Sequence, residues 1–317
     1  MTLRSTLGNV VGRIAGDDRL NTLRATEDRM RRTLSARIHP TGGADPQPAQ
    51  DVPREPQLRE GEPENRFAEA ELSRHDLIAQ LHETLRPRTY LEIGVNDGLS
   101  LALSRAVTIG VDPDFAVRSE IECPVQLVRD TSDEFFARAD PMAHLEGVPL
   151  DLAFIDGMHL AEFAYRDFMN LERYMASTGV IVLDDMLPRD ADEAARERFT
   201  RFWAGDVFKF GELLAELRPD LVVIPINTSP TGVVLVTGLD PASTVLQDAY
   251  ESVLDRLTSP DPQTVPESII HRRAAVGARS LLRSTAWPKL VALRDQADAR
   301  QAVRSAVLSL RRLKRLG

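Results

Sequence analysis

The length and composition of this chain limit what it can be. Its 317 residues, 43% of them hydrophobic, are enough for one large domain with appendages or for two small domains. The net charge of −9 argues against nucleic acid as the partner of the whole molecule. A single cysteine, Cys123, excludes an intrachain disulfide, and we see no apolar run of about 18 residues and no hydrophobic signal core. We therefore expect a soluble, cytoplasmic protein.

Changes in composition divide the chain into four parts. Residues 1–39 mix Leu, Val and Ile with arginines and predict a helical N-terminal extension. Residues 40–65 are rich in Pro, Gly, Gln and Glu, with too few apolar groups to offset chain entropy, which predicts a flexible linker. The main domain is expected over residues 66–258, opening with a helix that ends near Leu85. Residues 259–317 form a basic, helical C-terminal extension.

Strands and helices alternate through the main domain, which is the pattern of an α/β fold. Continuous apolar runs such as DLAFID and GVIVLDD are typical of parallel strands buried on both faces. Only Asn227–Gly232 separates the last two strands, so these two should be antiparallel. The expected strands are Tyr90–Ile93, Thr108–Asp112, Val125–Val128, Leu150–Ile155, Val180–Leu183, Leu221–Ile226 and Val233–Thr237. The expected helices are Leu99–Arg105, Ser132–Arg138, Ala161–Met175 and Ala191–Phe202.

The segment LEIGVNDGLS (Leu91–Ser100) carries the first functional signal. It predicts a strand followed by a glycine-bearing turn, where backbone N–H groups can meet a ligand. Asp112, which closes the next strand, is well placed to accept hydrogen bonds from a ribose. Together they indicate a nucleoside-containing cofactor. A dinucleotide site would need a third glycine, which makes a nicotinamide cofactor a less favoured alternative. An ordinary turn that binds no ligand is the other less favoured alternative.

The spacing Glu92-Ile-Gly94-Val-Asn-Asp-Gly98 resembles the first motif of class I S-adenosylmethionine (SAM) methyltransferases. Two later segments, IDGMHLAEFAYRDF (Ile155–Phe168) and STGVIVLDDM (Ser177–Met186), resemble small-molecule O-methyltransferases with an I-D-G-x-H motif. That group is related to macrolide-sugar and catechol O-methyltransferases. The likeness covers roughly residues 90–186 and extends more loosely to Gly238. It implies a Rossmann-like, doubly wound sheet of seven strands, mostly parallel, with an antiparallel last strand.

The resemblance also implies a role for individual residues in binding SAM. Glu92 would lie by the methionine amino group, and the glycine turn would approach the cofactor through its backbone. Asp112 would take the ribose hydroxyls, and Asp130, flanked by Thr131 and Ser132, would contact the adenine. The full set of expected cofactor residues is Glu92, Gly94, Asn96, Gly98, Asp112, Asp130 and Asp156. Ala161 is a departure, because relatives often carry an aromatic residue there.

Acidic residues end two strands that should be neighbours in the sheet. Asp156 follows one strand, and Asp184 and Asp185 end the next, so three carboxylates should converge at one edge. Oxygen ligands favour Mg²⁺ or Mn²⁺, although Asp184 or Asp185 could instead cap the next helix. The resembling sugar O-methyltransferases place a metal on the matching residues and a histidine base at the position of His159.

Further along the chain, Arg166 and Asp167 are expected to be a structural pair or cap. No lysine lies close in sequence to the motifs, which favours His159 over the lysine base of the catechol-type relatives.

The C-terminal part is strongly basic. Residues 270–317 hold twelve Lys or Arg and two Asp, a net of +10, which leaves −19 for the remainder. Apolar residues in Lys289–Leu316 are spaced as in a basic amphipathic helix. We expect this helix to dock on the body of its own or a neighbouring subunit, and the alternative is an anionic membrane surface. Membrane contact would make a glycolipid substrate plausible, and the N-terminal extension could form a homo-oligomer contact.

These features predict a SAM-dependent O-methyltransferase that acts on a hydroxyl of a sugar or natural product. A divalent metal and a histidine base would assist the reaction. Two alternatives stay open at this point. One is an NAD(P)-dependent oxidoreductase, which the missing third glycine disfavours. The other is a Rossmann-like scaffold without catalytic activity.

Overall fold

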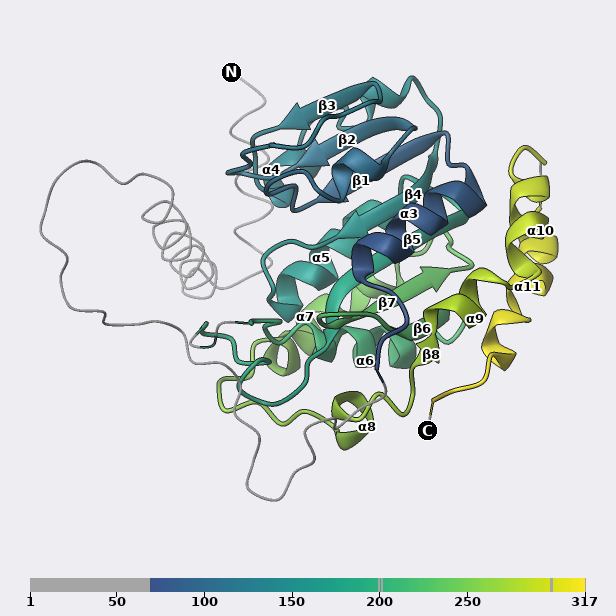
Figure 1. Ribbon diagram of the computed structural model, residues 1–317. Helices are drawn as coiled ribbons and strands as arrows, with labels where there is room; N and C mark the ends of the chain where they lie inside the picture. The colour runs from purple at the N-terminus through teal and green to yellow at the C-terminus, as the bar shows by residue number, and fades with distance from the viewer. Residues whose placement is uncertain (1–68, 199, 201, 297–298, 317) are drawn as a thin grey trace, which may run out of the picture. The chain divides into compact units, whose positions relative to one another are not determined.

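An eight-stranded sheet forms the centre of the computed structural model (Figure 1). The structure describes residues 69–198, 200, 202–296 and 299–316, all of them within the unit Asp51–Gly317. The predicted N-terminal extension (1–39) and linker (40–65) lie outside the described residues. Whether the division into four parts holds therefore stays a prediction.

The strand order is β3-β2-β1-β4-β5-β7-β6-β8. All seven predicted strands form, and β7 alone among the described strands runs antiparallel to its neighbours β5 and β6. The eighth strand is a two-residue addition that pairs with β6 through Ile226 and Val276. The predicted α/β fold is thus confirmed. The strands are β1 (Thr89–Ile93), β2 (Val107–Val111), β3 (Val125–Val128), β4 (Leu150–Ile155), β5 (Met175–Leu187), β6 (Val222–Asn227), β7 (Gly232–Thr237) and β8 (Val276–Gly277).

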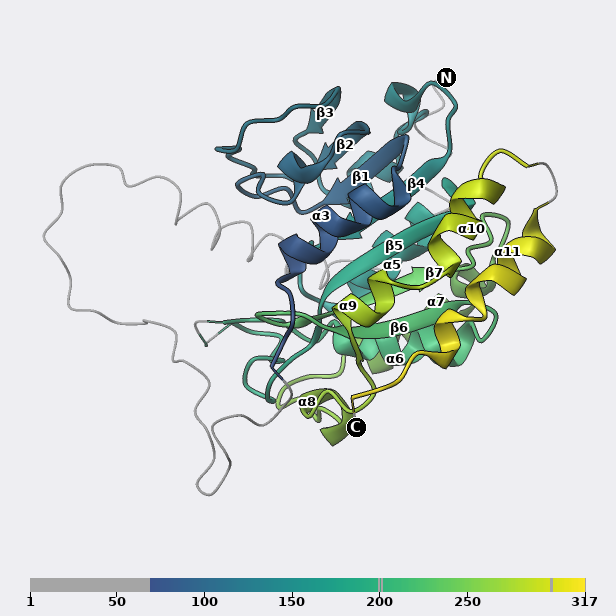
Figure 2. The same ribbon diagram turned by 45° about the vertical axis from the view of Figure 1, so that its right-hand side comes forward.

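Helices cover both faces of the sheet, as Figures 1 and 2 show. Successive strand residues point to opposite faces, so Tyr90 and Leu91 belong to two different buried clusters. One cluster packs under α3 (Arg74–Leu85), α9 (Ala278–Leu282), α10 (Ala286–Leu293) and α11 (Arg300–Val307). The other packs under α5 (Ala161–Glu172), α6 (Phe208–Leu217) and α7 (Val245–Leu257). The remaining elements are α4 (Ser132–Phe136), α8 (Glu267–Ile270), η1 (Leu101–Leu103), η2 (Ala143–Leu145) and η3 (Leu310–Arg312).

The sequence predicted that the first helix of the domain begins near residue 66. In the structure, helix α3 begins at Arg74. Ser73 caps it with a capping box, because its hydroxyl accepts from the N–H of Asp76 while the Asp76 carboxylate accepts from the N–H of Ser73. The cap is tied to the hairpin between β6 and β7, since the N–H of Arg74 donates to the carbonyl of Ser229 at 3.1 Å. This contact fixes the first turn of α3 beside the sheet.

The predicted helix over Leu99–Arg105 is wrong, because only the single 3-10 turn η1 forms there. Ser104 takes an extended backbone, and its hydroxyl accepts from the N–H of Ala106 at 3.1 Å, which turns the chain into β2. The glycine turn is therefore not followed by an α-helix. A ligand at this turn would meet loop N–H groups and not the N-terminus of a helix.

The predicted helix over Ala191–Phe202 is also wrong, since the described residues 191–198 form turns. In a helix, backbone carbonyls would accept the hydrogen bonds of these N–H groups, but here side-chain carboxylates accept them. Asp190 accepts from the N–H of Glu193 at 2.8 Å, and Asp261 accepts from the N–H of Arg196 at 3.0 Å. The helix that leads to β6 is α6 instead, which the sequence analysis did not predict.

The C-terminal segment doubles back as α10 and α11 and is not one helix over Lys289–Leu316. One helix of that length would be about 42 Å long. Because α10 and α11 pack side by side, both bury their apolar side chains on the sheet of this chain. These side chains are Trp287, Leu290, Val303, Ala306 and Val307. Within the described part of the chain, no helix has the length and apolar character that spanning a bilayer requires.

Candidate active site

The carboxyl ends of neighbouring strands bring the expected site residues to one edge of the sheet. The glycine turn follows β1, Asp112 follows β2, and Asp156 follows β4. Because β4 pairs with β1 on one side and with β5 on the other, Asp156 lies between the glycine turn and the acidic end of β5. This edge is where ligands of α/β proteins bind.

Gly94 joins the glycine turn to Asp156. Its φ is +90°, and a Cβ at this position would lie 1.8 Å from the carbonyl oxygen of Asp156. Only glycine satisfies both conditions. The close approach of the two backbones accounts for Gly94 without any ligand, and it places the turn in direct contact with the acidic cluster.

Asp112 fixes the same turn from the other side. Its Oδ2 accepts from the N–H of Asn96 at 2.8 Å, and its Oδ1 accepts from the N–H of Asp114 at 2.6 Å. Asp130 lies two residues beyond β3 and forms an ion pair with Arg138 at 2.5 Å. Both carboxylates thus stand at the ends of neighbouring strands, as predicted, and each is held by groups of the protein.

Glu92 is fully buried in β1, beneath the turn. The hydroxyls of Tyr90 and Ser100 donate to its two carboxylate oxygens at 2.6 and 2.7 Å. Burial raises the pKa of Glu92 to about 8, against the lowering effect of these two hydrogen bonds. The carboxyl group is therefore mostly protonated at neutral pH.

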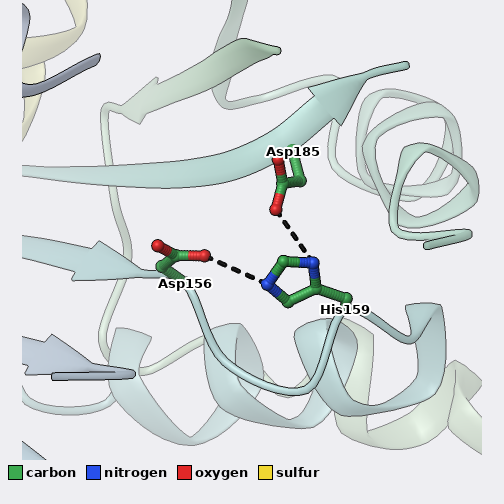
Figure 3. Close-up of side chains that lie close together, drawn as sticks. All are labelled: Asp156, His159 and Asp185. Carbon is green, nitrogen blue, oxygen red and sulfur yellow. Dashed lines mark ion pairs between the residues drawn. The ribbon is translucent and has the colours of Figure 1, made fainter. Parts of the chain in front are cut away.

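His159 lies between Asp156 and Asp185 (Figure 3). Its Nε2 is 3.3 Å from Oδ1 of Asp156, and its Nδ1 is 2.9 Å from Oδ2 of Asp185. The hydroxyl of Thr231, on the hairpin before β7, donates to the other oxygen of Asp185 at 2.6 Å. One oxygen or nitrogen from each of Asp156, His159 and Asp185 lies within 4.8 Å of the others.

Two residues of this group have strained backbones. His159 has φ +56° and Asp185 has φ +60°, in the left-handed region that non-glycine residues rarely occupy. Such conformations cost on the order of 1–3 kcal/mol each and persist where surrounding contacts enforce them. The contact between the imidazole and the Asp185 carboxylate joins these two positions.

The charges around His159 favour its protonated form. Burial lowers the pKa of the imidazole, but the carboxylates of Asp185 and Asp156 raise it well above its ordinary value. Burial raises the pKa of Asp156, but the contacts with His159 and Arg74 lower it overall. Nδ1 carries a proton in any case, because it also lies 3.1 Å from the carbonyl oxygen of Trp203, which can only accept. Nε2 is therefore the nitrogen that can exchange a proton.

Asp184 contacts a different cation. Its Oδ2 is 2.6 Å from a guanidinium nitrogen of Arg74, whose second nitrogen is 3.8 Å from Asp156. The Asp184 side chain is fully buried. Burial, followed by the charges of Asp185 and Asp156, raises the pKa of Asp184, while Arg74 acts in the opposite direction. Because a neutral Asp184 would leave the guanidinium 2.6 Å away without its counter-charge, we take Asp184 as ionised. The sequence analysis missed Arg74, because it lies on α3, before the first motif.

Residues 203–206, which precede α6, pack against the loop that carries His159. The indole of Trp203 stacks on the imidazole with ring centroids 5.0 Å apart and planes at 10°. Gly205, with φ +65°, packs so tightly that a Cβ there would lie 1.7 Å from the carbonyl oxygen of His159. Asp206 accepts from the N–H of Ala161 at 2.9 Å. The sequence analysis missed these contacts too, because it expected a helix over Ala191–Phe202 and did not consider Trp203, the next residue.

A pocket opens beside these groups, between the carboxyl ends of β4 and β5 and helix α5. Its polar lining residues are Asp156, His159, Asp167, Asp184 and Asp185. Burial raises the pKa of Asp167 to about 7. Arg166 forms its ion pair with Asp133, at 2.7 Å, and not with Asp167. That these two residues are structural rather than catalytic stays a prediction.

A family model described as a methyltransferase domain matches residues 91–186. This range runs from β1 to β5 and contains the glycine turn, Asp112, Asp156, His159 and Asp185. The chain therefore carries a methyltransferase domain, and the enzyme class predicted from the sequence is confirmed. No curated protein matches the chain.

Several solved structures are similar in part. The SAH-bound methyltransferase PaMTH1 of Podospora anserina is 14% identical, with a TM-score of 0.38, over 52% of this chain and 78% of that one. The SAM-bound O-methyltransferase TomG of Streptomyces achromogenes, involved in tomaymycin synthesis, is 19% identical (TM-score 0.38, 51% and 78%). An SAH-bound O-methyltransferase of Bacillus cereus is 16% identical (TM-score 0.37, 54% and 84%). Because these scores are low, the fold assignment rests on the sheet itself.

Proposed function

We propose that the protein transfers a methyl group from SAM to a hydroxyl group of a small molecule, with His159 as the base. One observation carries this proposal. The imidazole of His159 is held by Asp156 and Asp185 at the sheet edge, and Asp156 is in backbone contact with the glycine turn of a methyltransferase domain. A proton acceptor thus stands next to the expected position of the methyl donor.

The reaction is an in-line displacement. The acceptor oxygen attacks the methyl carbon, the carbon–sulfur bond breaks, and the hydroxyl proton must pass to a base. Neutral His159 can take that proton on Nε2, because its Nδ1–H is directed at Asp185 and the carbonyl of Trp203. The two carboxylates then stabilise the imidazolium that forms.

The cofactor would lie along the glycine turn. Asn96 and Asp112 are joined by a hydrogen bond, so the turn and the expected ribose acceptor form one unit. Asp156 borders this turn at Gly94, and the side chain of Val117 packs against Gly98. Glu92, at the methionine end, and Asp130, at the adenine end, complete the proposed set.

The geometry of this structure does not favour the divalent metal expected from the sequence. Of the three carboxylates predicted to hold Mg²⁺ or Mn²⁺, Asp184 and Asp156 face the guanidinium of Arg74. Within the described residues, the side chains that lie close enough together to hold a metal are those of Asp156, His159 and Asp185. The two nitrogens of His159 already contact the carboxylates of Asp156 and Asp185. A metal bound through that ring would remove the proposed base. We therefore derive no step through a metal.

A base at this position serves an acceptor that must lose a proton, such as an alcohol. We therefore propose that the acceptor is a hydroxyl of a sugar or natural product. A glycolipid acceptor at a membrane has less support. The apolar side chains of α10 and α11 that would contact a bilayer pack on the sheet of this chain.

Calorimetry and a transfer assay test the proposal. We expect the full-length chain to bind SAM but not NAD⁺ and to label a hydroxylated acceptor from a panel with methyl-labelled SAM. His159→Ala should keep SAM binding and lose transfer. Binding of NAD⁺ in place of SAM would support the oxidoreductase alternative. SAM binding with no dependence of transfer on His159 would remove the proposed base.

A further inference from the structure

The acidic cluster of Asp156, Asp184 and Asp185 contains a cation that the sequence analysis did not anticipate. Arg74 reaches it from α3, with one guanidinium nitrogen 2.6 Å from Asp184 and another 3.8 Å from Asp156. Its side chain is 25% exposed, whereas that of Asp184 is fully buried. A buried carboxylate needs a partner charge, and the planar guanidinium supplies one to two carboxylates at once.

The position of Arg74 is enforced by its surroundings. The Ser73 capping box fixes the start of α3, and the N–H of Arg74 donates to the carbonyl of Ser229 on the hairpin between β6 and β7. Thr231, on the same hairpin, donates to Asp185. One hairpin therefore positions both the cation and one member of the acidic cluster.

The placement runs against the preference of an isolated helix. Cations are unfavourable in the first turn, because the helix dipole is positive there, and Arg74 is the first residue of α3. The carboxylates offset this cost. Burial lowers the pKa of Arg74, but the charges of Asp184, Asp156 and Asp185 raise it by more, so the guanidinium stays charged.

We propose that Arg74 is the resident cation of this cluster and takes the place that the sequence assigns to Mg²⁺ or Mn²⁺. A guanidinium and a divalent ion cannot share the same oxygens of Asp184, since both would occupy the space between Asp184 and Asp156. Arg74 thus prevents Asp184 from acting as a metal ligand. The inference rests on the proposed function only in taking this cluster as the acceptor side of the site.

The test is a titration of the EDTA-treated, full-length protein with Mn²⁺, in which electron paramagnetic resonance measures the free ion. We expect the wild type to bind Mn²⁺ weakly and Arg74→Gln to bind it more than about tenfold more tightly, because a unit charge next to the ion is removed. The double variant Arg74→Gln/Asp184→Asn should return to weak binding. Arg74→Lys, which keeps the charge, should stay near the wild type.

Arg88→Gln is the matched control. Arg88 pairs with Asp151 at 2.9 Å at the opposite end of β4, so its loss removes an ion pair without touching the cluster. Its Mn²⁺ affinity should equal that of the wild type.

Tight Mn²⁺ binding by the wild type that Asp184→Asn abolishes would overturn the inference, even if Arg74→Gln fails to fold. Unchanged weak binding in folded Arg74→Gln would overturn it too. Neither result depends on SAM binding or transfer, which test the proposed function separately.

Discussion

The indole of Trp203 lies face to face with the imidazole of His159, at a centroid distance of 5.0 Å. The same residue accepts from Nδ1 of His159 through its carbonyl oxygen. One residue thus fixes both the plane of the ring and the nitrogen that carries the proton. Because the base must point at the acceptor hydroxyl, this contact bears directly on transfer.

We expect Trp203→Ala to lower kcat about 10–100-fold, since small displacements of a catalytic group have effects of this size. The affinity for SAM should be unchanged, and Trp203→Phe should restore part of the rate through its stacking ring. The measurements are transfer kinetics and SAM calorimetry.

Phe202→Ala is the control for this loop. Phe202 is 38% exposed and its ring faces the guanidinium of Arg189. A loss of rate in Phe202→Ala equal to that in Trp203→Ala would indicate a general loosening of the loop and no specific positioning of His159.

The pH dependence of transfer should report on His159. The acid form of the ring cannot accept a proton, so kcat should rise with pH through a midpoint above 6.5, because Asp185 and Asp156 raise the pKa of His159. Asp185→Asn removes the larger of these two effects and should move the midpoint to lower pH. Rate profiles between about pH 5.5 and 9 measure the shift. Identical midpoints in both proteins would contradict the assignment of His159 as the base.

The sheet was predictable because the apolar pattern of each strand lies within the strand itself. DLAFID and GVIVLDD are apolar on both faces, and the short link before Gly232 required an antiparallel pair. The meeting of Asp156 with Asp185 also followed from strand ends in a parallel sheet. The extra strand β8 did not, because two residues give no periodic pattern.

Arg74, Trp203 and the turns at 191–198 were not predictable, because their partners are distant in sequence. Arg196 donates its N–H to Asp261, and Arg74 meets Asp184 only when α3 lies beside the sheet. Local propensity favoured a helix at 191–198, and tertiary hydrogen bonds prevented it. The same limit explains why the sequence predicted the three carboxylates but not the arginine that contacts two of them.

A buried charge network supports the His159 loop and gives a stability prediction. Asp206 is fully buried, and it contacts Arg196 at 2.5 Å and Lys209 at 2.8 Å. Asp206→Ala should lower the free energy of unfolding by about 3–5 kcal/mol, because it leaves buried cations without this partner. Urea unfolding measures the change.

The exposed pair of Glu216 and Arg256 provides the comparison, at 2.9 Å with both side chains more than half exposed. Glu216→Ala should lower the free energy of unfolding far less than Asp206→Ala does, because solvent screens an exposed ion pair. Equal losses in the two variants would show that burial of the Asp206 network adds nothing to stability.

Glu92 predicts how the stability of the fold changes with pH. Its pKa is 4.5 in the unfolded chain and is raised to about 8 in the folded protein by burial. Between these two values the unfolded chain releases the proton while the folded protein keeps it. The contribution of Glu92 to stability is therefore complete below pH 4.5 and is lost as the pH rises to about 8.

Glu92→Gln removes this titration and keeps the size of the side chain. The variant should match the wild type near pH 4.5 and exceed it in unfolding free energy, by a few kcal/mol at most, near pH 8. Urea unfolding at the two pH values measures the difference. If the gap between variant and wild type is the same at both, Glu92 does not titrate as its burial implies. SAM calorimetry on the same variant separates this effect from the proposed role of Glu92 at the methionine amino group, which predicts weaker binding.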